Sequence, residues 1–341
     1  MSLALRDTLE QLLRRRDLSE AQAGELLEAL TDPDLAPALA GALLAALRSK
    51  GVTADEVRGL AGAMRRLARR PQLSAGASLV DVVGTGGDGS GSLNLSTGTA
   101  LLAAACGLRV VKHGNRAVSS RSGSADLLQA LGLKVPLDET EAGACLDATG
   151  FTFLFAPHYH PALKALAPIR SALGVRTVFN MLGPLANPAE PAFHLIGAFD
   201  LGAAELLAQT LARMNIERAF VVHGEPGWDE PTPVGPFTLF DVRPGQVART
   251  MRDAGAFGVR RCAAAELAGG DAEHNATALR AVFEGKDRGA HRDALLLGTA
   301  LVLELVGHAS DPREGVAIAA QAIDSGRARG LLVGLAAFGE R

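Results

Sequence analysis

The chain has 341 residues, of which 48% are hydrophobic, enough apolar material for one large or two ordinary globular domains. Its formal net charge of −3 excludes a broad basic surface for nucleic acid or an anionic membrane. No stretch reaches the roughly 18 apolar residues that a membrane helix needs, and residues 1–16 lack a long apolar core typical of signal peptides. Three scattered cysteines show no zinc-binding spacing. We therefore expect a cytoplasmic protein that acts on small molecules.

The first 70 residues predict helices only. Apolar residues recur at helical spacing in four segments, which are residues 3–13, 21–30, 35–47 and 57–67. Thr53 and Glu56 form a capping-box pattern at the start of the fourth segment. A break at Arg70-Pro71 ends this pattern, so we expect a helical domain over residues 1–72. An apolar helix face in this domain is also a candidate dimer surface.

The rest of the chain, residues 73–341, predicts an α/β domain with a mainly parallel central sheet. Short β-rich runs alternate with helical segments, as in a sheet with crossover helices; the runs are residues 79–83, 108–111, 152–155, 194–198 and 219–222. Two further runs around Pro244-Gly245 predict a hairpin. The segment 173–191 is rich in Gly, Pro and Asn, and we expect part of it to join the helical domain.

Polar, donor-rich loops follow the first two runs. The first ends in Gly84-Thr85-Gly86-Gly87-Asp88, a loop whose bare backbone N–H groups suit an oligo-anion, and Asn94-Leu95-Ser96-Thr97 then begins a helix. The second ends in Lys112-His113-Gly114-Asn115-Arg116, with Ser119, Ser120 and Ser124 close behind. Because the carboxyl ends of parallel strands meet at one edge of a sheet, these loops predict a phosphate-binding crevice.

Other interpretations of these loops are weaker. Residues 84–89 satisfy the GxGxxG pattern of dinucleotide-binding folds, but the helix begins about ten residues later and Lys112-His113 stands where a ribose-binding acid is expected. Asp88 would also place a carboxylate in the phosphate cradle. A purely structural glycine turn and a solvated basic loop are the remaining alternatives.

Two more features carry chemistry. Asp229 and Glu230 follow a strand, and adjacent carboxylates suit Mg²⁺ that also binds substrate phosphates, although an exposed acidic turn is the plain alternative. Because extended backbone would send the two side chains to opposite sides, only an irregular turn lets both converge on metal.

Arg170 stands on an apolar segment, residues 162–173, that predicts one helix. Taken alone, the plain interpretation is a solvent-facing arginine.

The glycine loop, the NLST turn, KHGNRAVSS and the Asp229-Glu230 pair, in this order, resemble the anthranilate phosphoribosyltransferase family. The resemblance continues through 153–157, 168–170 and 176–188 and covers most of the chain. It implies transfer of a phosphoribosyl group from 5-phosphoribosyl 1-diphosphate to anthranilate, a step of tryptophan biosynthesis. It also implies a nucleoside phosphorylase/phosphoribosyltransferase-like architecture of a small all-α domain with an α/β domain, and a homodimer through the helical domain.

The resemblance also implies the site residues. Those expected to bind phosphoribosyl diphosphate are Gly84, Gly87, Asp88, Ser92, Asn94, Leu95, Ser96, Thr97, Lys112, His113, Gly114, Asn115, Arg116, Ala117, Val118, Ser119, Ser120 and Ser124. Those expected to contact anthranilate are Gly84, Asn115 and Arg170, with His113, Tyr159 and His160 lining its approach. Ser96, Asp229 and Glu230 are expected to hold Mg²⁺, with two ions per subunit. No general base is assigned, because the aromatic amine attacks neutral.

Two alternative functions remain to be considered, and the sequence departs from the family pattern at two positions. Type II nucleoside phosphorylases share the architecture but lack the GTGGD loop and the acidic pair. A ligand- or nucleic-acid-binding paralogue is disfavoured by the intact acidic pair and the negative charge. Pro231 stands where the family usually has an apolar residue, and Gly298 where it commonly has Asn. Neither position is expected to touch a residue assigned to the chemistry.

Overall fold

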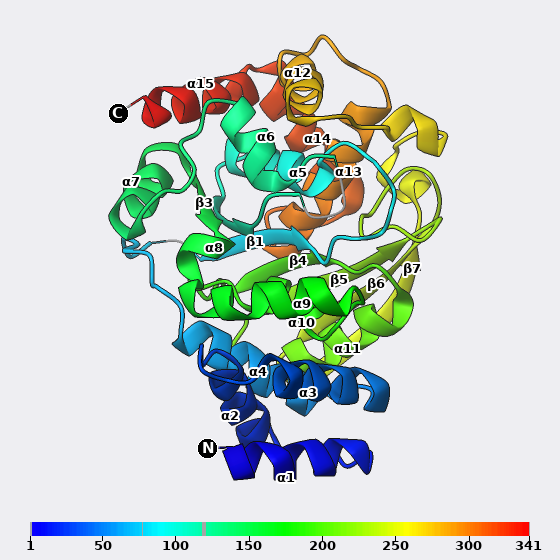
Figure 1. Cartoon of the computed structure of the whole chain (residues 1–341). Coiled ribbons are helices and arrows are strands. Elements are labelled where there is room, and N and C mark those ends of the chain that lie inside the picture. The colour runs from blue at the N-terminus through cyan, green and yellow to red at the C-terminus, as the bar shows by residue number, and fades with distance from the viewer. Residues whose placement is uncertain (1, 77, 118–120, 341) are drawn as a thin grey trace.

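The computed structural model describes residues 2–76, 78–117 and 121–340. Within them, a small helical domain lies at one end of a larger α/β domain (Figure 1). Its helices are α1 (Ser2–Leu13), α2 (Glu20–Leu30), α3 (Pro37–Lys50) and α4 (Ala54–Arg66), close to the four predicted segments. The predicted capping box is confirmed, since the Thr53 side chain accepts a hydrogen bond from the Glu56 backbone N–H.

The α/β domain is built on one seven-stranded sheet, which confirms the predicted fold class. The strand order is β3-β2-β1-β4-β5-β6-β7, in which β1 to β5 are parallel and β6 and β7 are antiparallel. The strands are β1 (Leu79–Gly84), β2 (Arg109–Gly114), β3 (Phe151–Phe155), β4 (Phe193–Gly197), β5 (Arg218–Gly224), β6 (Phe237–Arg243) and β7 (Gln246–Arg252). The five predicted parallel strands and the predicted hairpin are all present.

Helices cover both faces of the sheet (Figure 1). One face carries α5 (Leu95–Ala105), α6 (Ser124–Ala130), α7 (Glu139–Thr149), α12 (Ala272–Phe283), α13 (Ala290–Leu305), α14 (Pro312–Asp324) and α15 (Arg327–Gly339). The other carries α8 (Ala156–Tyr159), α9 (Ala167–Leu173), α10 (Phe179–Leu182) and α11 (Leu201–Leu211), with the helical domain beyond them.

Alternate residues of the buried strands enter two hydrophobic cores. Val82 packs in the core beneath α5 and α13, whereas Val83 packs in a second core with α4 and α11. Period-two alternation of apolar residues on both faces explains why the strands read as continuous hydrophobic runs. The second core is shared with the helical domain, so the two parts of the chain bury apolar surface against each other.

The segment between β3 and β4 crosses between the two parts. Residues 162–173, predicted as one helix, form a 3₁₀ turn over Pro161–Leu166 followed by α9, so this prediction is wrong in its first half. Further along, the amide Nδ2 of Asn187 donates to Asp81 Oδ2 and to Val111 O, both at 2.8 Å. Asp81 is completely buried, and its Oδ1 accepts from the His113 backbone N–H at 3.3 Å. This hydrogen-bond network fastens the crossing segment to β1 and β2.

Candidate active site

The candidate site lies at the carboxyl ends of β1, β2, β4 and β5. The chain leaves β1 towards β2 on one side, while β4 pairs with β1 on the other. Between β1 and β4 the strand order therefore reverses, and loops leaving this point open a crevice in which α/β sheets bind ligands. The polar loops predicted from the sequence begin at these strand ends.

The glycine loop follows β1 and bends by backbone conformations that favour glycine. Gly86 and Gly87 have φ of 70° and 74°. The Gly86 N–H donates to Asp229 Oδ2 at 2.6 Å, and Asp88 Oδ1 accepts from both the backbone and the hydroxyl of Ser90 at 3.0 Å. The loop thus holds one carboxylate of its own and contacts a second from the Asp229-Glu230 turn.

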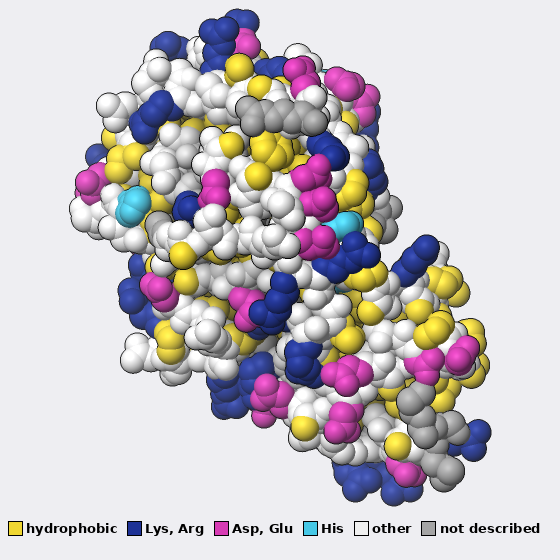
Figure 2. Space-filling view, turned by 90° about the vertical axis from the view of Figure 1, so that its left-hand side faces the viewer, with side chains coloured by type: hydrophobic (Ala, Val, Ile, Leu, Met, Phe, Trp, Pro, Cys, Tyr) yellow, Lys and Arg dark blue, Asp and Glu magenta, His cyan; other side chains and the backbone are white. Residues whose placement is uncertain are grey.

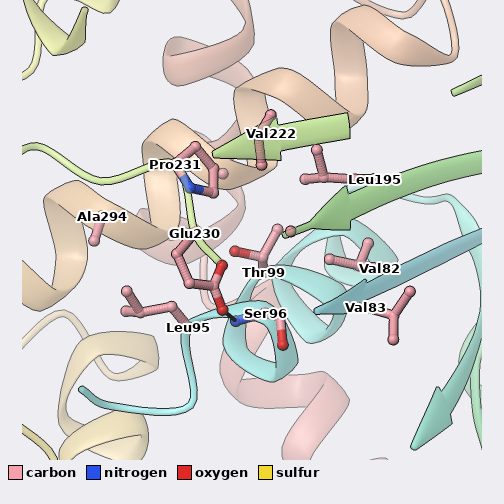
Figure 3. Close-up of a pocket in the computed structure, with 12 residues that line it drawn as sticks. Val82, Val83, Leu95, Ser96, Thr99, Leu195, Val222, Glu230, Pro231 and Ala294 are labelled. Carbon is pink, nitrogen blue, oxygen red and sulfur yellow. Dashed lines mark hydrogen bonds between the residues drawn. The ribbon is translucent and has the colours of Figure 1, made fainter. Parts of the chain in front are cut away.

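The predicted helix start is confirmed, since α5 begins at Leu95 with Asn94 as its N-cap residue. Ser96 N–H donates to Glu230 Oε1 at 2.9 Å (Figure 3), so a carboxylate occupies the helix N-terminus. Thr97 Oγ1 lies 3.1 Å from Ser124 Oγ, which brings hydroxyls from the two predicted loops together. These contacts unite the predicted phosphate-binding loops.

Asp229 and Glu230 do lie in an irregular turn. Asp229 points to the glycine loop and Glu230 to α5, and the Asp229 backbone N–H lies 3.3 Å from Asp88 Oδ2. Burial and the neighbouring Asp88 raise the pKa of Asp229 to about 7. Burial and Asp229 also raise the pKa of Glu230 well above its usual value. Crowded, buried carboxyl groups of this kind are stabilised by a cation.

The donor set fits Mg²⁺ completed by substrate oxygens rather than an all-protein cage. Among the described residues, no three His, Cys, Asp or Glu side chains converge into a metal site. Mg²⁺ is usually held by one or two carboxylates together with phosphates and waters. Asp88, predicted as a diphosphate contact, is placed here as a third nearby carboxylate.

Lys112 is buried at the end of β2 and points beneath the same site. Its Nζ donates to Val82 O and lies 3.4 Å from Ser96 Oγ. Burial lowers the pKa of Lys112, while the charges of Asp81, Glu230 and Asp229 oppose that shift. A fixed ammonium group therefore lies close to the position predicted for the diphosphate.

His113 and His160 form a buried, neutral pair. Their rings meet edge to face with centroids 5.0 Å apart, and His113 Nδ1 donates to Gly183 O at 3.1 Å, since a carbonyl can only accept. Burial lowers the pKa of His113 to about 3 and that of His160 to about 4. Tyr159, predicted to line the anthranilate approach, instead directs its hydroxyl to Asp138 O at 3.1 Å.

Residues 115–117, which follow β2, are held by hydrogen bonds and an ion pair to neighbouring residues of the chain. The Arg116 guanidinium pairs with Asp126 at 2.8 Å and lies 5.7 Å from the centre of the Phe155 ring. The Asp126 carboxylate also accepts from the Ala117 N–H at 3.0 Å, and Asn115 Oδ1 accepts from Arg116 N–H at 2.7 Å. The predicted residues Val118, Ser119 and Ser120 lie outside the described part of the chain.

Arg170 lies on α9, partly exposed, with its guanidinium 5.1 Å from the centre of the Phe179 ring. Burial lowers its pKa. Within the described ranges it makes no ion pair with an acidic side chain, and no acidic group contributes to the shift in its pKa. A half-buried guanidinium without an acidic partner is suited to a carboxylate brought by a ligand.

Two family models together match most of the chain. "Glycosyl transferase family, a/b domain" matches residues 76–329, and "Glycosyl transferase family, helical bundle domain" matches residues 6–68. The anthranilate phosphoribosyltransferase of Pelotomaculum thermopropionicum is 43% identical over 324 residues, which are 95% of this chain and 93% of the relative. That of Desulforudis audaxviator is 44% identical over 338 residues, 99% of this chain and 97% of the relative. The chain belongs to the anthranilate phosphoribosyltransferase family.

Solved structures of this family have the same fold. The enzyme from Thermus thermophilus matches with a TM-score of 0.91 and 40% identity, over 98% of this chain and all of the other. Anthranilate phosphoribosyltransferase from Saccharomyces cerevisiae in complex with PRPP and Mg matches with a TM-score of 0.90 and 27% identity, over 100% and 99% of the two chains. A complex of the yeast enzyme with 4-fluoroanthranilate matches similarly, with a TM-score of 0.89.

Pro231 and Gly298, the two departures from the family pattern noted in the sequence, both lie near the candidate site. Pro231 and Gly298 line a small cavity of about 10 Å³ together with Ser96, Thr99 and Glu230 (Figure 3). A Cβ at Gly298 would lie 2.5 Å from Thr99 Oγ1. A larger side chain at this position would therefore require Thr99 to move.

Two residues near the site carried no role in the sequence prediction. Asn275, on α12, donates through Nδ2 to Asn94 Oδ1 at 2.8 Å and accepts from the Gly270 N–H at 2.7 Å, which fixes the side chain of Asn94. Arg176 donates to Gly87 O and lies 4.2 Å from the centre of the Phe199 ring. Arg176 belongs to a family motif, which was a usable signal, whereas nothing in the sequence around Asn275 indicates its contact.

Proposed function

We propose that this chain transfers the phosphoribosyl group of 5-phosphoribosyl 1-diphosphate to the amine of anthranilate at the site described above. The products are N-(5-phosphoribosyl)anthranilate and diphosphate, and the reaction is a step of tryptophan biosynthesis. The observation that carries the proposal is the meeting of Asp88, Asp229 and Glu230 with the glycine loop and the start of α5. Carboxylates beside backbone N–H donors suit a substrate that carries a magnesium-bound diphosphate.

The diphosphate is held, in this proposal, between the glycine loop and the loop after β2. The predicted binding residues supply backbone N–H groups, hydroxyls and the ammonium of Lys112, which are the donors that phosphate oxygens require. To bind a phosphate, Arg116 would have to break its ion pair with Asp126. Since no step requires a strong base, the protein acts by positioning and by stabilising charge on the leaving group.

Ser96, Asp229 and Glu230 would hold Mg²⁺, with two ions per subunit, and Asp88 is near enough to assist. When bound, the metal neutralises charge on the departing diphosphate. The raised pKa values of Asp229 and Glu230 support this role, because burial and mutual repulsion disfavour the charged carboxylates and a bound cation would offset that cost.

Anthranilate is placed, in this proposal, by Arg170, Asn115 and Gly84. The guanidinium of Arg170 would bind its carboxylate through paired hydrogen bonds. The neutral His113–His160 pair supports the assignment indirectly, because it adds no positive charge that would compete for that carboxylate. The aromatic amine attacks while neutral and releases its proton afterwards.

The proposal is tested by identifying the products. The chain is incubated with anthranilate, phosphoribosyl diphosphate and Mg²⁺, and the organic product is identified by its mass while released diphosphate is quantified. Equimolar phosphoribosylanthranilate and diphosphate are expected. A nucleoside phosphorylase would instead consume inorganic phosphate and a nucleoside, and a ligand-binding paralogue would form no product; either result would refute the proposal.

We place the domain division near residue 72, with part of 173–191 joining the helical domain; contacts of α9 with α3 and of α10 with α4 support it. No helix in the described residues is long and apolar enough to cross a membrane, and a cytoplasmic location suits a biosynthetic enzyme.

A homodimer through the helical domain is also proposed. An apolar groove of about 520 Å³ lies between the α2–α3 region and α9. Figure 2 shows hydrophobic side chains on the helical domain at its lower right. Leu13, the last residue of α1, is 61% exposed. Light scattering coupled to gel filtration should give twice the mass of one chain; the mass of a single chain at micromolar concentration would contradict the proposal.

A further inference from the structure

The Asp229-Glu230 turn lies directly on the ends of three parallel strands, and each strand presents a glycine there. Gly84 and Gly197 are register partners at the ends of β1 and β4, and Gly224 ends β5. The turn is closed onto β5 by two hydrogen bonds of 2.9 Å between Gly224 and Trp228. Figure 3 shows the ends of these strands around Glu230.

The approach of the turn to these glycines leaves no room for a side chain. A Cβ at Gly197 would lie 1.6 Å from the backbone oxygen of Asp229, and one at Gly224 would lie 2.2 Å from the backbone oxygen of Glu230. Contacts under 3.0 Å are essentially never made by real Cβ atoms. Because both obstacles are backbone atoms, a rotamer change could not relieve either clash.

We infer that Gly197 and Gly224 are positioning residues that set the height of the Asp229-Glu230 turn above the sheet and so aim both carboxylates at the metal-diphosphate. The inference rests on the metal assignment proposed above. A methyl group at Gly197 would force the turn outward by more than 1 Å. That movement would disturb the 2.6 Å contact of Asp229 with Gly86 and the 2.9 Å contact of Glu230 with Ser96.

The chain offers a spectroscopic reporter of this movement. Trp228 is the only tryptophan in the sequence, immediately precedes Asp229, and is 7% exposed. Outward displacement of the turn would expose its indole ring to water, which shifts tryptophan emission to longer wavelength. Emission can be recorded without metal or substrate, so this readout does not depend on the proposed function.

The test compares Gly197→Ala with Gly143→Ala. Gly143 lies on α7, where a Cβ would meet the backbone oxygen of Gln72 at 1.9 Å, so the same clash arises away from the site. Circular dichroism and urea unfolding establish folding and stability, and Mn²⁺ binding in the presence of inorganic diphosphate is measured by calorimetry. We expect red-shifted Trp228 emission and at least tenfold weaker Mn²⁺ binding for folded Gly197→Ala, with native values for Gly143→Ala.

Native emission and native Mn²⁺ affinity in folded Gly197→Ala would overturn the inference, as would equal shifts in the Gly143→Ala control. If Gly197→Ala does not fold, Gly224→Ala carries the test, because its Cβ would meet the backbone oxygen of Glu230 at 2.2 Å. Weaker Mn²⁺ binding by this variant supports the inference, and unchanged binding refutes it. Failure of the native chain to consume anthranilate would refute the function alone, since neither readout uses anthranilate.

Discussion

Glu230 Oε1 accepts a 2.9 Å hydrogen bond from the backbone N–H of Ser96, a residue 134 positions earlier in the chain. The carboxylate therefore lies at the positive end of the α5 dipole, while the adjacent Asp229 binds the glycine loop. One turn thus connects the two segments proposed to hold the diphosphate. This relationship explains why the acidic pair should act through metal rather than as an acid and a base.

Asp229→Asn and Glu230→Gln should each raise the Mg²⁺ concentration for half-maximal rate by at least about tenfold, since each weakens a charged ligand. Initial rates are measured over a Mg²⁺ titration, and excess Mg²⁺ should partly restore turnover. Glu225→Gln is the matched control, because Glu225 is exposed on the same turn. A bell-shaped pH profile that vanishes in the two variants, with no change in metal requirement, would instead indicate acid–base roles.

Arg170→Ala should weaken the use of anthranilate far more than the binding of phosphoribosyl diphosphate. Loss of a guanidinium from a buried carboxylate costs about 2 to 5 kcal/mol. Both substrates are titrated in steady-state assays, and Lys164→Ala, which removes an exposed cation from the preceding turn, serves as control. Equal losses for both substrates would show that Arg170 acts structurally.

Gly86→Val should abolish binding of phosphoribosyl diphosphate while the chain stays folded. A Cβ at Gly86 meets no atom within 4 Å, so the core is not disturbed, but φ of 70° is unfavourable for valine and the side chain would hinder close backbone approach by a ligand. Gly245→Val is a matched control, with φ of 73° and equally open space in the β6–β7 turn. Calorimetry that finds normal binding in folded Gly86→Val would place the cradle elsewhere.

Asp81 should make the stability of the protein depend on pH. Burial raises its pKa to about 6 from an ordinary 3.8, so the folded chain binds this proton more tightly than the unfolded chain. Its contribution to the free energy of unfolding, about 3 kcal/mol, is therefore fully present only well below the unfolded pKa of 3.8 and is lost as the pH rises through 6.

The measurement is urea unfolding of the native chain and of Asp81→Asn across pH 4 to 7. The native chain should lose about 2 kcal/mol more than the variant over this range. The variant also loses one acceptor for His113 or Asn187, but that deficit does not change with pH. Parallel stability curves would show that Asp81 titrates normally.

The elements of the fold could be predicted because their signals are local. Helical spacing and the Thr53 capping box located α4, and apolar runs located the strands. The segment before Arg170 was predicted less well, since its helical periodicity does not distinguish a 3₁₀ turn from an α-helix. The strand order was not predicted, because no local pattern in the sequence specifies which strands pair.

The site could be predicted only in part, because its residues meet through tertiary contacts. The glycine loop and the acidic pair stand out as motifs, but their direct contact between Gly86 and Asp229 spans 143 positions. Gly197 and Gly224 look like ordinary strand ends, and only the packed turn shows why neither can carry a side chain. The position of Gly298 beside the site could not be predicted for the same reason, since α13 reaches the site through packing against α5.

The most direct test of the account is a fluorescence assay of anthranilate consumption by the native chain. Anthranilate, phosphoribosyl diphosphate and Mg²⁺ are combined with the protein, and the decay of anthranilate fluorescence is compared with reactions that lack one component or contain excess chelator. We expect decay only when all components are present and arrest on adding chelator. Unchanged fluorescence with folded protein, or the same decay in chelator as in Mg²⁺, would contradict the proposed activity.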